Sequence, residues 1–166
     1  MAIRPIRMLG DPRLYEPSLP VAPDELPGVD ALVADLHDSL LDFRQRYGAG
    51  RAIAAPQIGV MKRLIYVHID RPTVLLNPAL DRLSQETMAV WDDCMCFPDL
   101  LVRVMRHKSC RVSFRDREWQ LVLWELGGDL SELLQHEYDH LDGVLAVARA
   151  IDDRSFALRS QRALLK

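Results

Sequence analysis

The sequence predicts an α+β fold in which antiparallel sheets surround a buried helix, with one further helix at each end of the chain. Two observations lead to this prediction. Short runs that alternate apolar and polar residues fill the middle of the 166-residue chain, and stretches with helical spacing of apolar residues flank them. The length and the 49% hydrophobic content suit one core, so we expect a single domain over residues 1–166.

The first part of the chain predicts an extended segment followed by a helix. Residues 1–28 are rich in proline and other turn formers, and we expect them to run over the surface of the domain. From Val29 to about Tyr47 apolar residues recur at helical spacing, with charged residues on the other side, and glycines follow. The glycine- and alanine-rich stretch 48–59 is expected to be a loop.

The middle of the chain predicts antiparallel strands, because its runs alternate and favour β-branched or aromatic residues. The expected strands lie at 63–69, 73–77, around 101–105, 108–116 and 118–126. Helical spacing then returns from Leu130 to Gly143, with Asp129 as its expected N-cap. A last amphipathic helix, basic on one side, is expected from about Asp152 to the end.

Composition argues against several classes of partner. A net charge of -3 and a pI near 5.9 provide no general attraction for phosphate backbones, and no run of five basic residues provides a local one. The sequence contains no signal-peptide pattern and no run of 18 apolar residues. We therefore expect no nucleic-acid site, no membrane partner and a cytoplasmic location.

The expected helix 130–143 carries His136 and His140 four residues apart, with Glu137 between them. Two histidines at this spacing project from one face and can bind a single ion, while the carboxylate reaches a water beside it. The alternative explanation of the same pattern is two helix histidines that are satisfied by hydrogen bonds and bind no metal. A useful metal site for hydrolysis needs a third protein ligand and one open position.

The third ligand is not found where zinc proteases of the zincin class usually place it, because no histidine or glutamate follows His140. Upstream, the segment WDDCMCFPD contains Cys94 and Cys96, either of which could supply a thiolate. Their alternation suggests that only one faces the site. Three cysteines in total, two of them separated by one residue, do not indicate a disulfide framework.

Three segments together resemble the peptide deformylase family in their order and spacing. They are GRAIAAPQ at 50–57, DDCMC at 92–96 and QHEYDHLDG at 135–143, and the opening segment LGDPRLYEPSLPV is also similar. The resemblance implies one divalent ion, most often Fe2+ in this family, with Zn2+, Ni2+ or Co2+ able to take the same site. The implied ligands are Cys94, His136 and His140.

The resemblance also implies an activity, namely removal of the formyl group from N-formylmethionyl peptides or nascent proteins with release of formate. In that reaction Glu137 serves as general base and then as general acid. The Gln57 side chain and the Met95 backbone N–H would form the oxyanion hole. The implied partner is a formylated peptide or nascent chain, with the ribosome as a candidate place of action.

Several residues depart from the family pattern at positions that the resemblance places near the substrate. The implied substrate-binding residues are Gly50, Ile53, Asp93, Glu132 and Leu133. Asp93 replaces a glycine and adds bulk and negative charge, and Glu132 stands where relatives often have an apolar or basic residue. Two alternatives follow, an amidohydrolase with a changed acyl or amine substrate, and an inactive metal-bound homologue that binds peptide N-termini or the ribosome.

Smaller departures concern the residues around the expected ligands. Ala52 replaces the second glycine of the first motif, and Cys96 replaces a serine. Asp92 stands in place of a family glutamate that supports a ligand histidine and pairs with an arginine, for which Arg106 is the counterpart here. We expect this pair to persist in a shifted geometry because aspartate is one methylene shorter.

Overall fold

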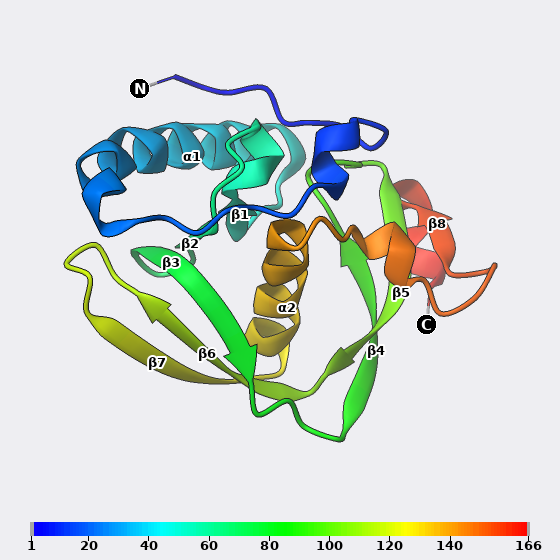
Figure 1. Cartoon of the computed structure of the whole chain (residues 1–166). Helices are drawn as coiled ribbons and strands as arrows, with labels where there is room; N and C mark the ends of the chain where they lie inside the picture. The colour runs from blue at the N-terminus through cyan, green and yellow to red at the C-terminus, as the bar shows by residue number, and fades with distance from the viewer. Residues whose placement is uncertain (1, 166) are drawn as a thin grey trace.

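The computed structural model describes residues 2–165 and confirms the α+β prediction (Figure 1). The α-helices are α1 (Leu26–Tyr47) and α2 (Asp129–Leu141). The strands are β1 (Ala52–Ala54), β2 (Leu64–His68), β3 (Pro72–Asp81), β4 (Thr87–Asp93), β5 (Leu100–His107), β6 (Ser109–Arg115), β7 (Leu121–Gly127) and β8 (Phe156–Leu158). They form two antiparallel sheets, ordered β1-β2-β3-β6-β7 and β4-β5-β8. Met1 and Lys166, the ends of the expected domain, lie outside the described residues.

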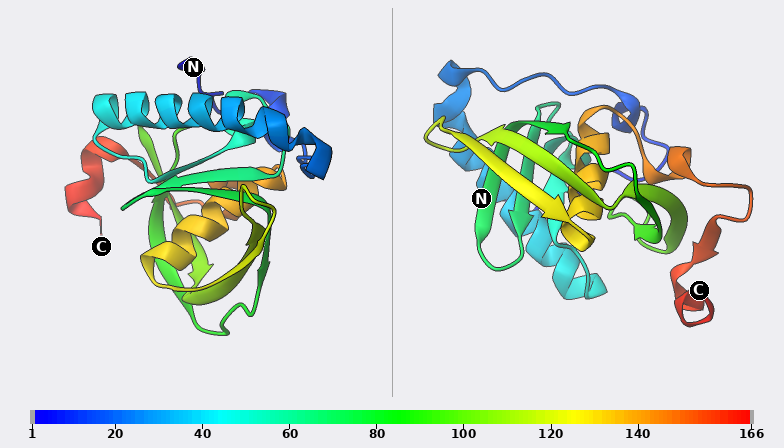
Figure 2. Two further views of the ribbon diagram at one scale, coloured as in Figure 1. Left: turned by 90° about the vertical axis from the view of Figure 1, so that its left-hand side faces the viewer. Right: turned by 90° about the horizontal axis from the view of Figure 1, so that it is seen from below.

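Helix α2 lies between the two sheets, as Figures 1 and 2 show. Leu133, Leu134 and Leu141 pack into a core cluster with residues of the larger sheet. The helix also buries polar side chains, and these are Gln135, His136, Glu137, Asp139 and His140. Burying so many polar groups is costly unless each finds a partner, so α2 is built for a site rather than for packing alone.

The expected N-cap of α2 is wrong. Gly128 occupies the cap position with φ of 56°, and Asp129 is the first residue of the helix. A glycine adopts this backbone conformation at little cost, so the chain turns into the helix without a side-chain cap. The Asp129 side chain remains 95% exposed.

Helix α1 packs on the outer side of the larger sheet through Val29, Leu36, Leu40 and Phe43. It begins three residues earlier than predicted, since a proline in the first turn lacks only an N–H that would be unpaired there. It ends where Gly48 takes a left-handed conformation with φ of 66°. No helix within residues 2–165 has the length and apolar character to span a membrane.

The N-terminal segment runs over the surface as expected, with short 3-10 turns at Pro12–Tyr15 and Pro23–Glu25. Its backbone forms hydrogen bonds to two other segments of the chain. The N–H of Arg7 donates to the Gln57 carbonyl over 2.8 Å, and the N–H of Leu9 donates to the Cys96 carbonyl over 2.9 Å. The segment thereby connects two of the three family-like motifs.

The expected C-terminal helix is wrong. Residues Phe156–Leu158 instead form β8, which pairs with β5, and Arg159–Leu164 form a 3-10 helix. An isolated helix of this length is marginal in water unless it buries an apolar face, and none of Arg159–Leu164 is buried. Strand β5 has a free edge on the side away from β4, and pairing with it satisfies the backbone.

Strands β1 and β4 are not predicted from the sequence. β1 lies within the stretch expected to be a loop, which continues as the 3-10 helix Ala55–Ile58. β4 leads directly into Cys94. β1 therefore lies within the first family-like motif, and β4 ends within the second.

The packing of α2 generates a prediction about stability. Leu134 is 1% exposed in the core, whereas Leu130 on the same helix is 41% exposed. We expect Leu134→Ala to lower the free energy of unfolding by about 2–5 kcal/mol, because it leaves a cavity. Leu130→Ala should change it by less than about 1 kcal/mol. Urea denaturation of the two metal-free variants measures the difference, and equal losses would contradict this packing.

Candidate metal centre

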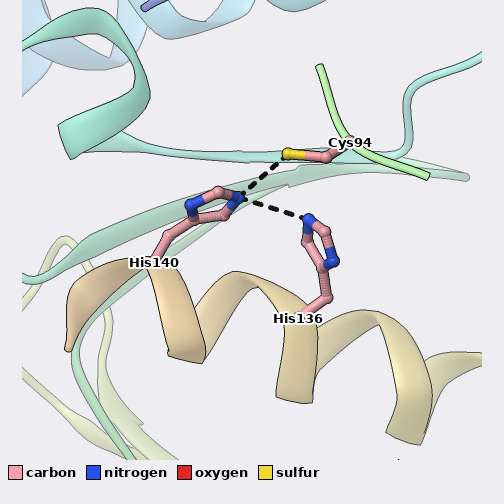
Figure 3. Close-up of side chains that lie close together, drawn as sticks. All are labelled: Cys94, His136 and His140. Atoms are coloured by element: carbon pink, nitrogen blue, oxygen red, sulfur yellow. Dashed lines mark hydrogen bonds between the residues drawn. The ribbon is translucent and has the colours of Figure 1, made fainter. Parts of the chain in front are cut away.

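Three donor atoms meet between α2 and the segment after β4 (Figure 3). The Nε2 atoms of His136 and His140 are 3.2 Å apart, and the Sγ atom of Cys94 lies 3.3 Å from Nε2 of His140. The three donor atoms lie within 4.8 Å of one another, and all three residues are buried. The histidines are one helical turn apart, which brings both rings to the same face.

These distances fit a divalent ion. A tetrahedral ion with bonds of about 2.3 Å to sulfur and about 2.0–2.1 Å to nitrogen separates two nitrogens by about 3.3 Å, and sulfur from nitrogen by about 3.6 Å. The separations in the protein are close to both values. One thiolate and two imidazoles form a donor set suited to iron or zinc, and three protein ligands leave room for a further one.

A buried ion-pair network contacts His136, one of the three candidate ligands. Asp92 Oδ1 lies 2.9 Å from His136 Nδ1, on the opposite side of the ring from the donor atom. Arg106 pairs with Asp92 over 2.8 Å and with Asp139 over 2.6 Å, and its side chain is 3% exposed. Such a carboxylate fixes the orientation and tautomer of the ring. The shorter side chain of Asp92 therefore reaches both partners.

Burial alone would favour the neutral forms of Asp92 and His136. The ion-pair network instead favours the charged form of each. Burial raises the pKa of Asp92, yet His136 and Arg106 outweigh it and hold that pKa at about 2. Burial lowers the pKa of His136, yet the Asp92 carboxylate raises it to about 10. An ion on Nε2 replaces the proton that His136 would otherwise carry, so metal uptake releases a proton.

The other two donors are affected mainly by burial. Burial and the charge of His136 hold the pKa of His140 well below its usual value, so its Nε2 lone pair is free for an ion. Burial raises the pKa of the Cys94 thiol well above its usual value. A thiolate at this depth needs a cation beside it, and a bound metal ion provides one.

Glu137 is the group best suited to move a proton. It is 4% exposed, and its Oε2 atom has no hydrogen-bond partner among residues 2–165. Burial raises its pKa to about 7, despite the opposing charge of His136. A carboxyl group with a pKa near the working pH can both accept and donate a proton.

Two hydrogen-bond donors lie beside the ligands. The Gln57 side chain is fixed by the Ala54 N–H, which donates to its Oε1 over 2.8 Å, so Nε2 faces Cys94 and Cys96 at 3.8 and 3.6 Å. Met95 is buried, and its backbone N–H donates to no acceptor within residues 2–165. Both donors can serve an oxygen that gains negative charge.

A cavity of about 440 Å³ opens beside the donor atoms, and Glu137, Gln57 and Met95 line it. Most of the residues expected to bind substrate also line it, and these are Gly50, Asp93, Glu132 and Leu133. Ile53 is not among the residues that line it, so its substrate contact stays a prediction. Its side chain is wholly buried in the core cluster under α1, because successive residues of β1 face opposite sides of the sheet and Ala52 and Ala54 face the other core cluster.

Sequence reasoning missed several charged residues around the cavity. Arg51 lies 3.3 Å from Glu132, and Arg159 lies 2.7 Å from Asp93. Arg51 follows the expected Gly50 directly and could have been considered with it. Nothing in the sequence placed Arg159 near the cavity, because its position depends on the pairing of β8 with β5.

The comparisons with known proteins agree with this geometry. The family model described as polypeptide deformylase matches residues 3–155. A peptide deformylase of Rhizobium meliloti is 36% identical over 154 residues, covering 89% of this chain and 84% of that protein. The crystal structure of peptide deformylase from Thermotoga maritima superposes with a TM-score of 0.84 at 27% identity, covering 92% of this chain and all of that one.

A third similar protein is a class I type b peptide deformylase from Acinetobacter baumannii, whose crystal structure has Met-Ala-Ser bound. Its TM-score is 0.81 at 27% identity, with 89% of this chain and 98% of that one covered. The family match spans all three motifs and ends before β8. The chain belongs to the peptide deformylase family.

Proposed function

We propose that this chain hydrolyses the N-formyl group of N-formylmethionyl peptides or nascent chains and releases formate. The observation that carries the proposal is the position of Glu137, which lines one cavity together with Cys94 and His136 and has a pKa raised to about 7. A site that only stored a metal would have no use for a buried carboxyl group with a free oxygen. The bound Met-Ala-Ser of the Acinetobacter baumannii relative supports a peptide ligand.

The sheet edges beside the cavity suit an extended peptide. β1 and β4 each stand at the end of their sheet, and the cavity is lined by residues of both strands or directly beside them. Unpaired backbone groups on a sheet edge can bind a peptide in extended conformation through main-chain hydrogen bonds. Such binding reads the peptide backbone, which suits an enzyme that acts on many N-termini.

The residues of the chain divide the chemistry between them. A divalent ion held by Cys94, His136 and His140 supplies Lewis-acid chemistry, which polarises the formyl group and acidifies water. Glu137 accepts the proton of the attacking water and later passes it to the amine nitrogen as the C–N bond breaks. The products are formate and a peptide with a free amino group.

Gln57 and Met95 stabilise the charge that develops on the formyl oxygen. The Gln57 Nε2 is held in place by the bond from Ala54 to its carbonyl oxygen, and the Met95 N–H is free to donate. Donors that are fixed in advance cost no reorganisation during the reaction, and one such donor contributes about 3–4 kcal/mol. We assign these two groups to the oxyanion hole.

Iron is the metal that we propose for the cell, with Zn2+, Ni2+ or Co2+ able to occupy the same donors. The support is the mixed donor set of one thiolate and two imidazoles, which suits all of these borderline ions. A cytoplasmic location and action at the ribosome stay predictions of the family resemblance.

Two observations bear on the alternative functions. A metal-binding protein without activity would close its site with four protein ligands, but only three donors cluster within residues 2–165. A changed substrate has more support, because the Arg51–Glu132 pair makes part of the cavity wall polar. A deformylase-like amidohydrolase with a different side-chain preference is therefore the second candidate.

Metal binding should depend on Cys94 and not on Cys96. In wild-type protein we expect a divalent ion to raise the melting temperature and a chelator to reverse this, because the ion binds only the folded state. Cys94→Ser should abolish the stabilisation, whereas Cys96→Ser should keep it, since only Cys94 Sγ belongs to the donor cluster. Thermal unfolding with and without Zn2+ measures both, and the opposite pattern would move the third ligand to Cys96.

Glu137 should be needed for turnover but not for metal binding. We expect Glu137→Gln to lower kcat by about 10²–10⁴-fold, because an amide cannot accept the proton, while one ion per chain remains bound. Formate release from formyl-Met-Ala-Ser and metal analysis of the same samples measure the two properties. Asp129→Asn, a change to an exposed acid on the same helix, is the matched control and should retain activity. Unchanged turnover in Glu137→Gln would refute the assigned role.

A further inference from the structure

The segment after the family match forms part of the cavity wall. Residues 156–165 follow the last matched residue, and β8 places them beside β5 (Figure 1). Arg159 and Arg162, from the 3-10 helix that follows β8, both line the cavity that contains Glu137. Residues three apart in a 3-10 helix lie on the same side, so both guanidinium groups face one region.

Arg159 fastens this segment to residues on both sides of Cys94 in the chain. Its backbone N–H donates to the Asp99 carbonyl over 2.8 Å, and its Nε donates to the Pro98 carbonyl over 2.6 Å. One further nitrogen of the guanidinium lies 2.7 Å from Asp93 Oδ2. The charge of Asp93 is thereby neutralised, which explains how an acid can stand at this position beside the cavity.

Arg162 is left with an unmatched positive charge. Within residues 2–165 no hydrogen bond or ion pair reaches its guanidinium. The other charged side chains of the cavity are paired: Arg51 with Glu132, Asp93 with Arg159, and Asp92 with Arg106. Apart from the candidate metal ligands and Glu137, the charged group of the cavity that has no ion-pair partner within residues 2–165 is therefore the guanidinium of Arg162, at the exposed rim.

We propose that residues 156–165 are a specificity element, in which the Asp93–Arg159 pair fixes the segment and Arg162 binds a carboxylate of the peptide substrate. The proposal rests on the proposed function, since it assumes that a peptide enters this cavity with its formyl group at the ion. Arg162 lies at the exposed rim, so the carboxylate belongs to a residue after the formylated one. It is an acidic side chain or, in a short peptide, the C-terminal carboxylate.

The test measures binding apart from chemistry. Fluorescent formyl-Met peptides of four residues, with Asp or Asn at position two, three or four and with a free or amidated C-terminus, are titrated into Zn2+-loaded Glu137→Gln protein. We expect peptides with the carboxylate to bind about 3- to 5-fold more tightly in one register, as suits an exposed ion pair. The difference should shrink in high salt. The Asp and amide series distinguish the two sources of the carboxylate.

Variants of the segment are then made in the same Glu137→Gln background. Arg162→Ala should remove the preference and Arg162→Glu should reverse it, whereas Arg154→Ala, an exposed arginine outside the cavity, should keep it. The double variant Asp93→Ala and Arg159→Ala should also lose the preference although Arg162 is intact, because the segment is no longer fastened.

The outcomes separate this proposal from the proposed function. Equal binding of Asp and Asn peptides, or a preference that survives Arg162→Ala, overturns the specificity element even if wild-type protein releases formate. A preference that depends on Arg162, in a protein that releases no formate, overturns deformylation and keeps the specificity element. No binding of any peptide overturns the specificity element as well.

Discussion

One buried guanidinium group connects the parts of this site. Arg106 lies on β5 and pairs with Asp92 at the end of β4 and with Asp139 on α2. Asp92 in turn contacts His136 and stands two residues before Cys94. A buried charge without a partner costs several kcal/mol, so the structure keeps these pairs aligned. The spacing between the thiolate and the two imidazoles is a consequence of that alignment.

The same network prepares the protein for a cation. Asp92 holds its negative charge beside a histidine, and its field raises the pKa of His136 while burial raises that of Glu137. His136 would give up its proton to a bound ion, and the Cys94 thiolate would gain a cation beside it. Glu137 does not belong to the donor cluster, so in the proposed function it exchanges the proton while the other three residues bind the ion.

The ligand helix could be predicted because its information is local. Helical spacing around His136, Glu137 and His140 predicts one face, and the structure confirms the helix within about one residue at its start. The choice between Cys94 and Cys96 was open from the residues themselves, because only one residue separates them and either could supply a thiolate. It depends on where β4 ends relative to α2, which no local pattern encodes.

The C-terminal segment could not be predicted for the same reason. Its residues have helical spacing, but β5 offers a free edge, and pairing with that edge outweighs the propensity of a short exposed helix. The ion pair of Asp93 with Arg159 could not be predicted either, because β8 is what brings Arg159 close to Asp93. The burial of the Ile53 side chain was not foreseen because β1 was not recognised as a strand from the sequence.

X-ray absorption spectroscopy of the metal-loaded protein tests the central claim most directly, namely that Cys94, His136 and His140 together hold one ion. The account predicts a first shell with one sulfur at about 2.3 Å, two imidazole nitrogens at about 2.0–2.1 Å and a light-atom ligand in the remaining position. A first shell without sulfur, or with two sulfur atoms, would contradict it.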